Sequence, residues 1–187
     1  VNQLVLEGLF GRCSQVTSTN KLMKKGYVAK LKVKVLLLKH EEKLFEGYQD
    51  EIEYLVEHDG RNNYIKNLAI DLKGNTLILF NYVDKHGIPL FNLINSNTER
   101  PVYLVHGGVD TDDREDIRHL TETSDNAIIV ASYGTFSTGI NIKNLHNVIF
   151  ASPSKSRIRN LQSIGRVLRK GDNKSKATLY DIADDIS

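Results

Sequence analysis

Residues 76–80 read TLILF, and three more short apolar runs follow them: VYLV at 102–105, AIIVA at 127–131 and VIFA at 148–151. Each run is bounded by turn-forming residues and is too short for a helix, which favours strands that are buried on both faces. Segments with helical spacing lie between the runs, at 85–94, 111–121 and 156–169. Strands that alternate with helices predict βαβ units and a mostly parallel sheet covered on both faces, an α/β fold.

The pattern continues on either side of these runs. Residues 29–39, AKLKVKVLLLK, alternate at first and then become continuously apolar, which predicts a strand that is half-exposed at its start and buried at its end. Residues 48–57 and 62–72 carry apolar residues at helical spacing, and Gly74 ends the second helix. A last strand is predicted at 177–182, with Asp184-Asp185 beyond it.

Composition limits the class of protein. The chain has 187 residues, of which 40% are hydrophobic and 26% charged, the balance of a soluble globular domain. No apolar run approaches the roughly 20 residues that span a bilayer, and the single cysteine, Cys13, excludes an internal disulfide framework. A reducing, cytoplasmic setting is expected. The net charge of +2 does not by itself indicate nucleic-acid binding. Any phosphate contact would depend on the local placement of Lys, Arg and backbone N–H groups.

Residues 1–27 differ from the rest of the chain. They contain a predicted short basic helix at 19–25, ended by Gly26, and too little apolar surface to fold alone. We expect this segment to pack on the main domain or to belong to a missing neighbour. The main domain is predicted to span residues 28–187. The chain opens with Val1 instead of Met, which suggests a processed or shortened polypeptide.

Two glycine-containing segments follow predicted strands, at the edge where open parallel sheets bind ligands. Gly107 and Gly108 come after the strand that ends at Val105, where they would let the backbone approach a phosphate closely. The alternative is a tight turn that needs positive φ. Residues 132–141, SYGTFSTGIN, form a predicted loop rich in hydroxyls and glycines, which could donate to phosphate oxygens. An ordinary polar loop is the alternative there.

The predicted helix at 156–169 is the most informative segment. Its residues Leu161, Ile164 and Leu168 form a core stripe. A second face carries polar and cationic side chains at spacings of three and four, namely Arg159, Gln162, Arg166 and Arg169. Guanidinium groups three residues apart form a fork that suits a cluster of phosphate oxygens. The alternative is a solvated basic face.

These motifs resemble the superfamily 2 helicases. Residues 162–169, QSIGRVLR, match the Q-x-x-G-R-x-x-R pattern of motif VI. Residues 132–141 look like motif V, with Asn141 where Asp is commoner, and TLILF and VYLVHGG are similar to motif IV and the motif that follows it. Order and spacing agree over residues 28–187. Within the superfamily, the amino-acid sequence of these motifs is especially similar to that of a phage helicase type. Helicases of that type act in recombination and replication-fork remodelling.

The resemblance implies a fold and residue roles. The fold would be a three-layer RecA-like domain, of the P-loop NTPase type, that lacks its own P-loop. Arg169 would be an arginine finger and Arg166 a second contact to the γ-phosphate of ATP. Gln162, Gly139 and Asn141 would line the nucleotide cleft. The tracked DNA or RNA strand would be contacted through its phosphates by Gly107, Gly108, Ser132 and Thr135.

The sequence also lacks two motifs that a helicase motor needs. It contains no G-x-x-x-x-G-K-[ST] and no D-E-x-[HDQ] run, so ATP and Mg²⁺ would be held mainly by a first RecA-like lobe. The chain alone is therefore not expected to hydrolyse ATP. Two other classes stay open: a nucleic-acid-binding module without ATP chemistry, and a small-molecule enzyme with His106 or His146 as base. A lone histidine is more often structural, which ranks the enzyme last.

Overall fold

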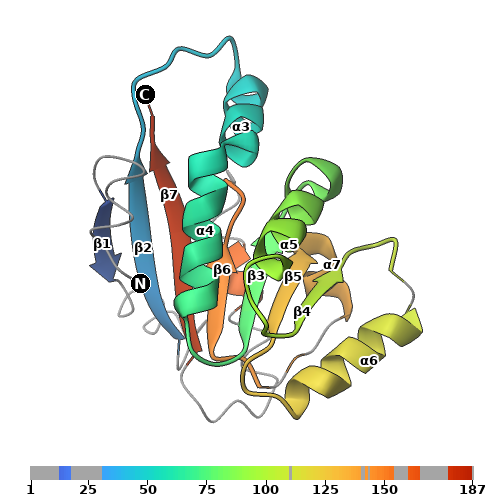
Figure 1. Ribbon diagram of the computed structural model, residues 1–187. Helices are drawn as coiled ribbons and strands as arrows, with labels where there is room; N and C mark the ends of the chain where they lie inside the picture. The colour runs from blue at the N-terminus through green and yellow to red at the C-terminus, as the bar shows by residue number, and fades with distance from the viewer. Residues whose placement is uncertain are drawn as a thin grey trace.

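A single mixed sheet organises the part of the chain that the computed structural model describes, which is residues 13–17, 31–109, 111–139, 142, 144–153, 160–164 and 177–186. Seven strands in these residues follow the order β1-β2-β7-β6-β3-β5-β4 (Figure 1). Only β1 is antiparallel to its neighbour. The strands are β1 (Cys13–Thr17), β2 (Leu31–Lys39), β3 (Thr76–Phe80), β4 (Val102–Val105), β5 (Ile128–Ser132), β6 (Asn147–Phe150) and β7 (Ala177–Asp185).

Helices cover both faces of this sheet. They are α3 (Tyr48–Glu57), α4 (Asp59–Asp71), the π-helix η1 (Val83–Gly87), α5 (Ile88–Asn95), α6 (Thr111–Glu122) and α7 (Tyr133–Gly139), with a further helical segment at 160–164. Figure 1 shows α4 and α5 on one face, and α7 behind it on the other. The predicted fold class is confirmed: a parallel sheet lies between two helical layers.

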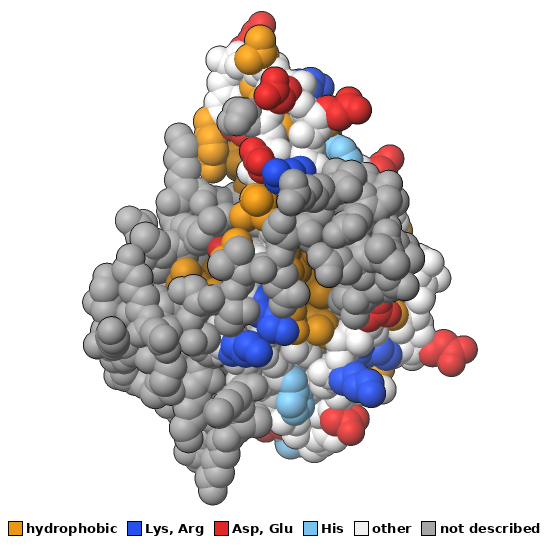
Figure 2. Space-filling model, turned by 90° about the vertical axis from the view of Figure 1, so that its left-hand side faces the viewer, with side chains coloured by type: hydrophobic (Ala, Val, Ile, Leu, Met, Phe, Trp, Pro, Cys, Tyr) orange, Lys and Arg blue, Asp and Glu red, His pale blue; other side chains and the backbone are white. Residues whose placement is uncertain are grey.

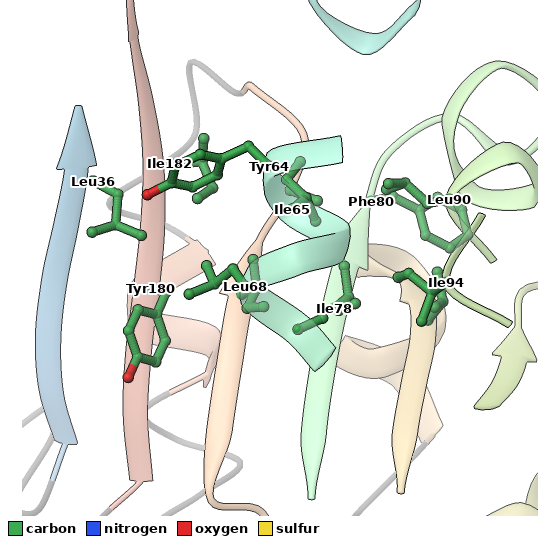
Figure 3. Close-up of a cluster of buried hydrophobic side chains, with 14 of the residues drawn as sticks. Leu36, Tyr64, Ile65, Leu68, Ile78, Phe80, Leu90, Ile94, Tyr180 and Ile182 are labelled. Atoms are coloured by element: carbon green, nitrogen blue, oxygen red, sulfur yellow. The ribbon is translucent and has the colours of Figure 1, made fainter. Parts of the chain in front are cut away.

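The two cores follow from the alternation of side chains along each strand. In β3, Ile78 and Phe80 point to the face of α4 and α5, whereas Leu77 and Leu79 belong to the core on the other face. Figure 3 shows Leu68 of α4 and Ile94 of α5 beside Ile78 and Phe80 in the first core. Each such side chain contributes about 1.5–3 kcal/mol when it is fully buried.

Most predicted boundaries are confirmed to within one residue. The structure gives α3, β3 and β4 the predicted ends, and shifts β5 and β6 by one residue. Helix α4 begins at Asp59, three residues before the predicted start, because the ring of His58 caps it by accepting the Arg61 N–H at 3.0 Å. Strand β7 reaches Asp185, so the prediction that Asp184-Asp185 follow the last strand is wrong. Pairing with β2 continues to the Lys39–Asp185 pair and keeps the backbone extended.

Two further predictions need correction. The helix expected at 85–94 consists of the π-helix η1 followed by α5. The loop expected at 132–141 is wrong for residues 133–139, which form α7. Ser132 precedes this helix and its hydroxyl accepts the Thr135 N–H at 3.3 Å, which is the bond of an N-cap. A composition of serines, threonines and glycines, typical of loops, here supplies a cap and a short helix.

The N-terminal segment contributes one strand to the sheet. Strand β1 pairs antiparallel with β2, Cys13 opposite Leu38 and Thr17 opposite Lys34. The expected helix at 19–25 lies outside the described residues, and the division at residue 27 stays a prediction. Of the helix expected at 156–169, residues 160–164 are described and are helical. None of the helices in the described part of the chain is long and apolar enough to cross a membrane.

We predict that Gly87→Ala destabilises the protein by about 1–3 kcal/mol, because a Cβ there overpacks the core. That Cβ would lie 2.4 Å from the ring of Phe80, which is fully buried. Chemical denaturation measures the difference. The matched control is Gly134→Ala in α7, where a Cβ meets nothing within 4 Å, so the free energy of unfolding should hold or rise slightly. Equal effects of the two substitutions would contradict this account of Gly87.

Candidate functional site

The structure brings two of the predicted segments together at one edge of the sheet. Strands β4 and β5 are parallel neighbours, and Val105 pairs with Ala131. The Gly107-Gly108 turn and Ser132 follow these paired residues directly, so they lie at the carboxyl ends of adjacent strands. This is the edge at which open α/β sheets bind their ligands.

The turn at Gly107 and Gly108 is exposed and is closed by a side chain. The Gly108 N–H donates to His106 Nδ1 at 3.0 Å, and the Val109 N–H donates to the His106 carbonyl at 3.0 Å. Among the described residues only Gly74 has a positive φ, so the interpretation of this turn as one that needs positive φ is wrong. A Cβ on Gly107 would meet nothing within 4 Å. The Gly107 carbonyl accepts from Arg114 Nη2 at 3.3 Å, and the space beside its Cα is open to an approaching group.

Ser132 and Thr135 form one hydroxyl pair at the start of α7. Their Oγ and Oγ1 atoms lie 2.7 Å apart, in addition to the N-cap bond. Thr135 is buried, and Ser132 is partly exposed. The pair thus has a structural role in capping α7, beside the phosphate contact that the resemblance implies.

The nucleotide-cleft residues are described only in part. Gln162 is partly exposed on the helical segment 160–164, whose Leu161 and Ile164 are buried against the second face of the sheet. This confirms two members of the predicted core stripe. Gly139 is the last residue of α7. Asn141, Arg166 and Arg169 lie outside the described residues, so their roles stay predictions.

A buried ion pair that sequence reasoning missed lies at the same edge, on β7. Arg61 of α4 is fully buried and donates from Nε and Nη2 to the two carboxylate oxygens of Asp184, at 2.9 and 3.0 Å. Its Nη1 donates to the carbonyl of Ala151, the residue after β6. His40, after β2, contacts Asp184 Oδ1 through Nε2 at 2.8 Å. One guanidinium therefore joins α4 to two neighbouring strands.

Electrostatics keeps this carboxylate charged. Burial alone would raise the pKa of Asp184, but the Arg61 charge and the hydrogen bonds from His40 and Arg61 hold that pKa below its usual value. His40 and the cationic Arg61 thus replace the water that the carboxylate loses on folding.

A second buried chain of hydrogen bonds runs beside the ion pair. His86 of η1 is fully buried, with Nδ1 2.7 Å from Ser152 Oγ and Nε2 3.0 Å from Asn62 Oδ1. Ser152 Oγ also accepts the Asn81 N–H at 3.0 Å, and Asn62 Nδ2 donates to the Val56 carbonyl at 2.9 Å. Burial first, and then the charge of Arg61, lowers the pKa of His86 to about 3, so the ring is neutral.

A weak signal for these two networks was present in the sequence. His40 and Asn81 directly follow β2 and β3, and Ser152 is the second residue after β6, at the edge where ligands of α/β sheets bind. Their partners Arg61 and His86 lie on helices that carry no motif. Only the fold places the partners beside them.

The two histidines of the small-molecule enzyme hypothesis bond to the backbone. His146 Nδ1 accepts the Asn75 N–H at 2.9 Å, and its ring packs against Gly74, where a Cβ would lie 2.6 Å away. His106 Nδ1 accepts the Gly108 N–H. Both rings thus have structural roles in their turns. No group of three His, Cys, Asp or Glu in the described part of the chain could hold a metal ion.

Exposed carboxylates lie near both halves of this edge of the sheet. The end of the molecule at α3 carries exposed carboxylates and one fully exposed leucine, namely Glu41, Glu42, Glu46, Asp50, Glu57, Asp59 and Leu44. Figure 2 shows acidic and hydrophobic side chains gathered at this end. A phosphate backbone would be repelled there. The Gly107 turn, which follows β4, leads into α6, whose first turn carries Asp112 and Asp113.

Comparison with known proteins agrees with this geometry. The model of the family described as helicase conserved C-terminal domain matches residues 60–171, more than half of the chain. The ATP-dependent DNA helicase uvsW of Enterobacteria phage T4 is 41% identical over 185 residues. These residues are 95% of this chain but 36% of the T4 protein, so the chain spans about a third of that relative.

Solved structures show the same fold. The crystal structure of T4 UvsW matches with a TM-score of 0.72 and 40% identity, over 83% of this chain and 33% of that one. The C-terminal domain of the DEAD-box protein Dbp5 matches with a TM-score of 0.54 and 18% identity, over 70% of this chain and 73% of that one. The second likeness concerns the fold alone. Together they confirm the RecA-like fold and the resemblance to a phage helicase.

We predict that acid destabilises the protein through His86. Below about pH 6.5 the unfolded chain takes up a proton at this residue, whereas the folded chain does so only near pH 3. The free energy of unfolding should therefore fall with falling pH by about 1.4 kcal/mol per pH unit from this group alone. Urea denaturation between pH 6 and pH 4 measures the slope.

The comparison is with His86→Asn, which removes the titrating ring. The variant should show a slope smaller by that amount. Burial first, and the charges of His40 and Arg61 next, also lower the pKa of His58, but that contribution is present in both proteins. Equal slopes in the two proteins would show that His86 takes up its proton in the folded state too.

Proposed function

The chain belongs to the helicase conserved C-terminal domain family, and from this premise we propose that it is the second motor lobe of an ATP-dependent DNA helicase. The observation that supports this most is the 41% identity to the T4 DNA helicase across 95% of the chain, motif VI included. The sequence contains neither a P-loop nor a Mg²⁺-binding acidic run, so in this proposal ATP and Mg²⁺ are held mainly by the first RecA-like lobe.

In this proposal the chain completes a nucleotide site across two lobes. Arg169 is the arginine finger, and Arg166 a second contact to the γ-phosphate. Gln162 couples the nucleotide state to the interface, and Gly139 and Asn141 line the cleft. A guanidinium at the transferring phosphoryl group stabilises the charge of the transition state and contributes roughly 10³–10⁵ in rate. Alone, the chain does not hydrolyse ATP.

The same proposal places the tracked DNA strand on β4 and β5. Gly107 and Gly108 offer exposed backbone, and Ser132 a partly exposed hydroxyl, at adjacent strand ends. Thr135 is buried and acts through its hydroxyl pair with Ser132. Contacts of this kind hold the phosphate backbone without reading bases.

We predict the outcome of a chimera in which this chain replaces the matching segment of T4 UvsW. The chimera should hydrolyse ATP with stimulation by DNA, because it restores the missing lobe. Arg169→Ala should lower kcat by roughly 10³–10⁵, with DNA affinity largely intact. The measurements are phosphate release and fluorescence anisotropy of labelled DNA. The isolated chain should release no phosphate.

The matched control for the finger is Arg118→Ala. Arg118 lies on the surface of α6, paired with Glu115 and Glu122, and should not affect turnover. If Arg169→Ala keeps the full kcat, Arg169 is not an arginine finger. If the chimera binds DNA but does not hydrolyse ATP, the alternative of a non-catalytic nucleic-acid-binding module is favoured instead.

We predict that Gly107→Asp weakens DNA binding by the chimera several-fold, because it places a carboxylate beside the strand phosphates. The control is Gly47→Asp at the N-cap of α3, an element that the proposal does not place against the strand. A Cβ at either glycine meets nothing within 4 Å, so both variants should fold. Anisotropy titrations at two salt concentrations test this, since the loss should shrink at high salt. Equal affinity of the two variants would place the strand elsewhere.

A further inference from the structure

We infer that His86 and Ser152 are positioning residues for the motor reaction, which fix the end of β6 and with it the helical segment that carries Gln162. The inference rests on the proposed function and adds residues outside the motifs. It starts from the chain of buried hydrogen bonds that joins α4, η1 and the residues after β3 and β6.

The direction of every bond in this chain is determined. Asn62 Nδ2 must donate, because its partner is the Val56 carbonyl, so Asn62 Oδ1 is an acceptor. His86 Nε2 therefore carries the proton that it donates to Asn62. A neutral ring then has a bare Nδ1, which accepts from the Ser152 hydroxyl. That hydroxyl in turn accepts the Asn81 N–H. One tautomer and one rotamer satisfy all partners.

The backbone after β3 positions the His86 imidazole between Ser152 and Asn62. In η1 the N–H groups of His86 and Gly87 both donate to the Tyr82 carbonyl, at 3.1 and 2.8 Å. The wider π turn directs the His86 side chain into the core, where it is fully buried. Gly87 lets the turn pack against Phe80 without a side chain. Single π-helical turns of this kind occur often at functional sites.

Consecutive residues of α4 hold consecutive residues after β6. Arg61 binds the Ala151 carbonyl, and Asn62 holds Ser152 through His86. The preceding residue, Phe150, belongs to the core cluster of the opposite face that also contains Leu161 and Ile164. A shift of the β6 end would therefore move the packing surface of the segment that carries Gln162.

A purely stabilising role explains these groups less well. Burying a neutral histidine and an amide costs desolvation, which an apolar core of the same volume avoids. A fully satisfied polar network instead specifies one geometry. Catalytic groups that must reach a partner lobe need such a geometry, because misplacement by about 1 Å can cost 10²-fold in rate.

The experiment compares two variants of His86 in the chimera with T4 UvsW. His86→Asn keeps an acceptor near the position of Nδ1 and so retains the bond from Ser152. His86→Gln keeps a donor toward Asn62 and loses the acceptor. The inference expects kcat near the unmodified value for His86→Asn and at least tenfold lower for His86→Gln. Ser152→Ala should behave as His86→Gln, and KM for ATP and DNA affinity should stay within twofold in all three.

The matched control is Asn75→Ala, which breaks a buried polar network at the opposite edge of the sheet. The Asn75 amide donates to the carbonyls of Thr121, Ser124 and Asn144. Its loss should lower the melting temperature as much as His86→Gln does, with kcat unchanged. Equal losses of kcat in His86→Asn and His86→Gln, or a loss in Asn75→Ala of the same size, would make the effect one of stability and overturn the inference.

A spectroscopic measurement on the isolated chain tests the geometry without turnover. Nitrogen NMR of the His86 ring should show a protonated Nε2 and a bare Nδ1, unchanged from pH 5 to pH 8. The backbone amide signal of Gln162 should shift in Ser152→Ala and hold in Asn75→Ala. A protonated Nδ1 with a bare Nε2 overturns the inference. So does a Gln162 amide signal that does not shift in Ser152→Ala.

The two proposals fail in different ways. An unmodified chimera without DNA-stimulated turnover overturns the proposed function and this inference together. A chimera that turns over and is indifferent to His86→Gln and Ser152→Ala overturns the inference alone.

Discussion

The ion pair between Arg61 and Asp184 constrains how α4 lies against the ends of β6 and β7. Arg61 is fully buried, and a guanidinium cannot escape the cost of burial by losing its proton. It therefore needs both carboxylate oxygens of Asp184 and the carbonyl of Ala151 at once. These partners are available only when β6, β7 and α4 have their observed arrangement. Removing one partner of such a pair costs about 3–5 kcal/mol, so few alternative packings compete.

The central strand β3 is held by polar groups at both of its ends. At the amino end, Asn75 Nδ2 donates to three carbonyls, and Asn75 Oδ1 accepts the Ala127 N–H. At the carboxyl end, the Asn81 N–H is held by Ser152. Between them, all five residues of β3 are buried. The sheet thus combines an apolar middle, which supplies most of the stability, with polar edges that fix which residues stand opposite one another.

An element can be predicted from the sequence when the pattern that determines it lies within the element itself. Helix α3 and strands β3 and β4 were predicted with correct ends, because apolar spacing and turn residues are local. Strand β7 was predicted too short, because its last residues are extended only through pairing with β2. Helix α7 was missed because its serine cap resembles a loop in composition. The π turn that buries His86 has no local signal comparable to a cap.

The same distinction applies to the site. Gly107, Gly108 and Ser132 could be placed at one edge from the sequence because they lie at the ends of strands, and parallel strands end at a common edge. Arg61, His86, Ser152 and Asp184 could not be paired from the sequence, because as many as 123 residues separate the partners. Motifs record the residues that contact a ligand, whereas the residues that hold them in place are recognisable only by contact in space. A motor site divided between two lobes, as proposed for this chain, would depend on both sets of residues, since neither lobe alone could correct the position of a group that reaches the other.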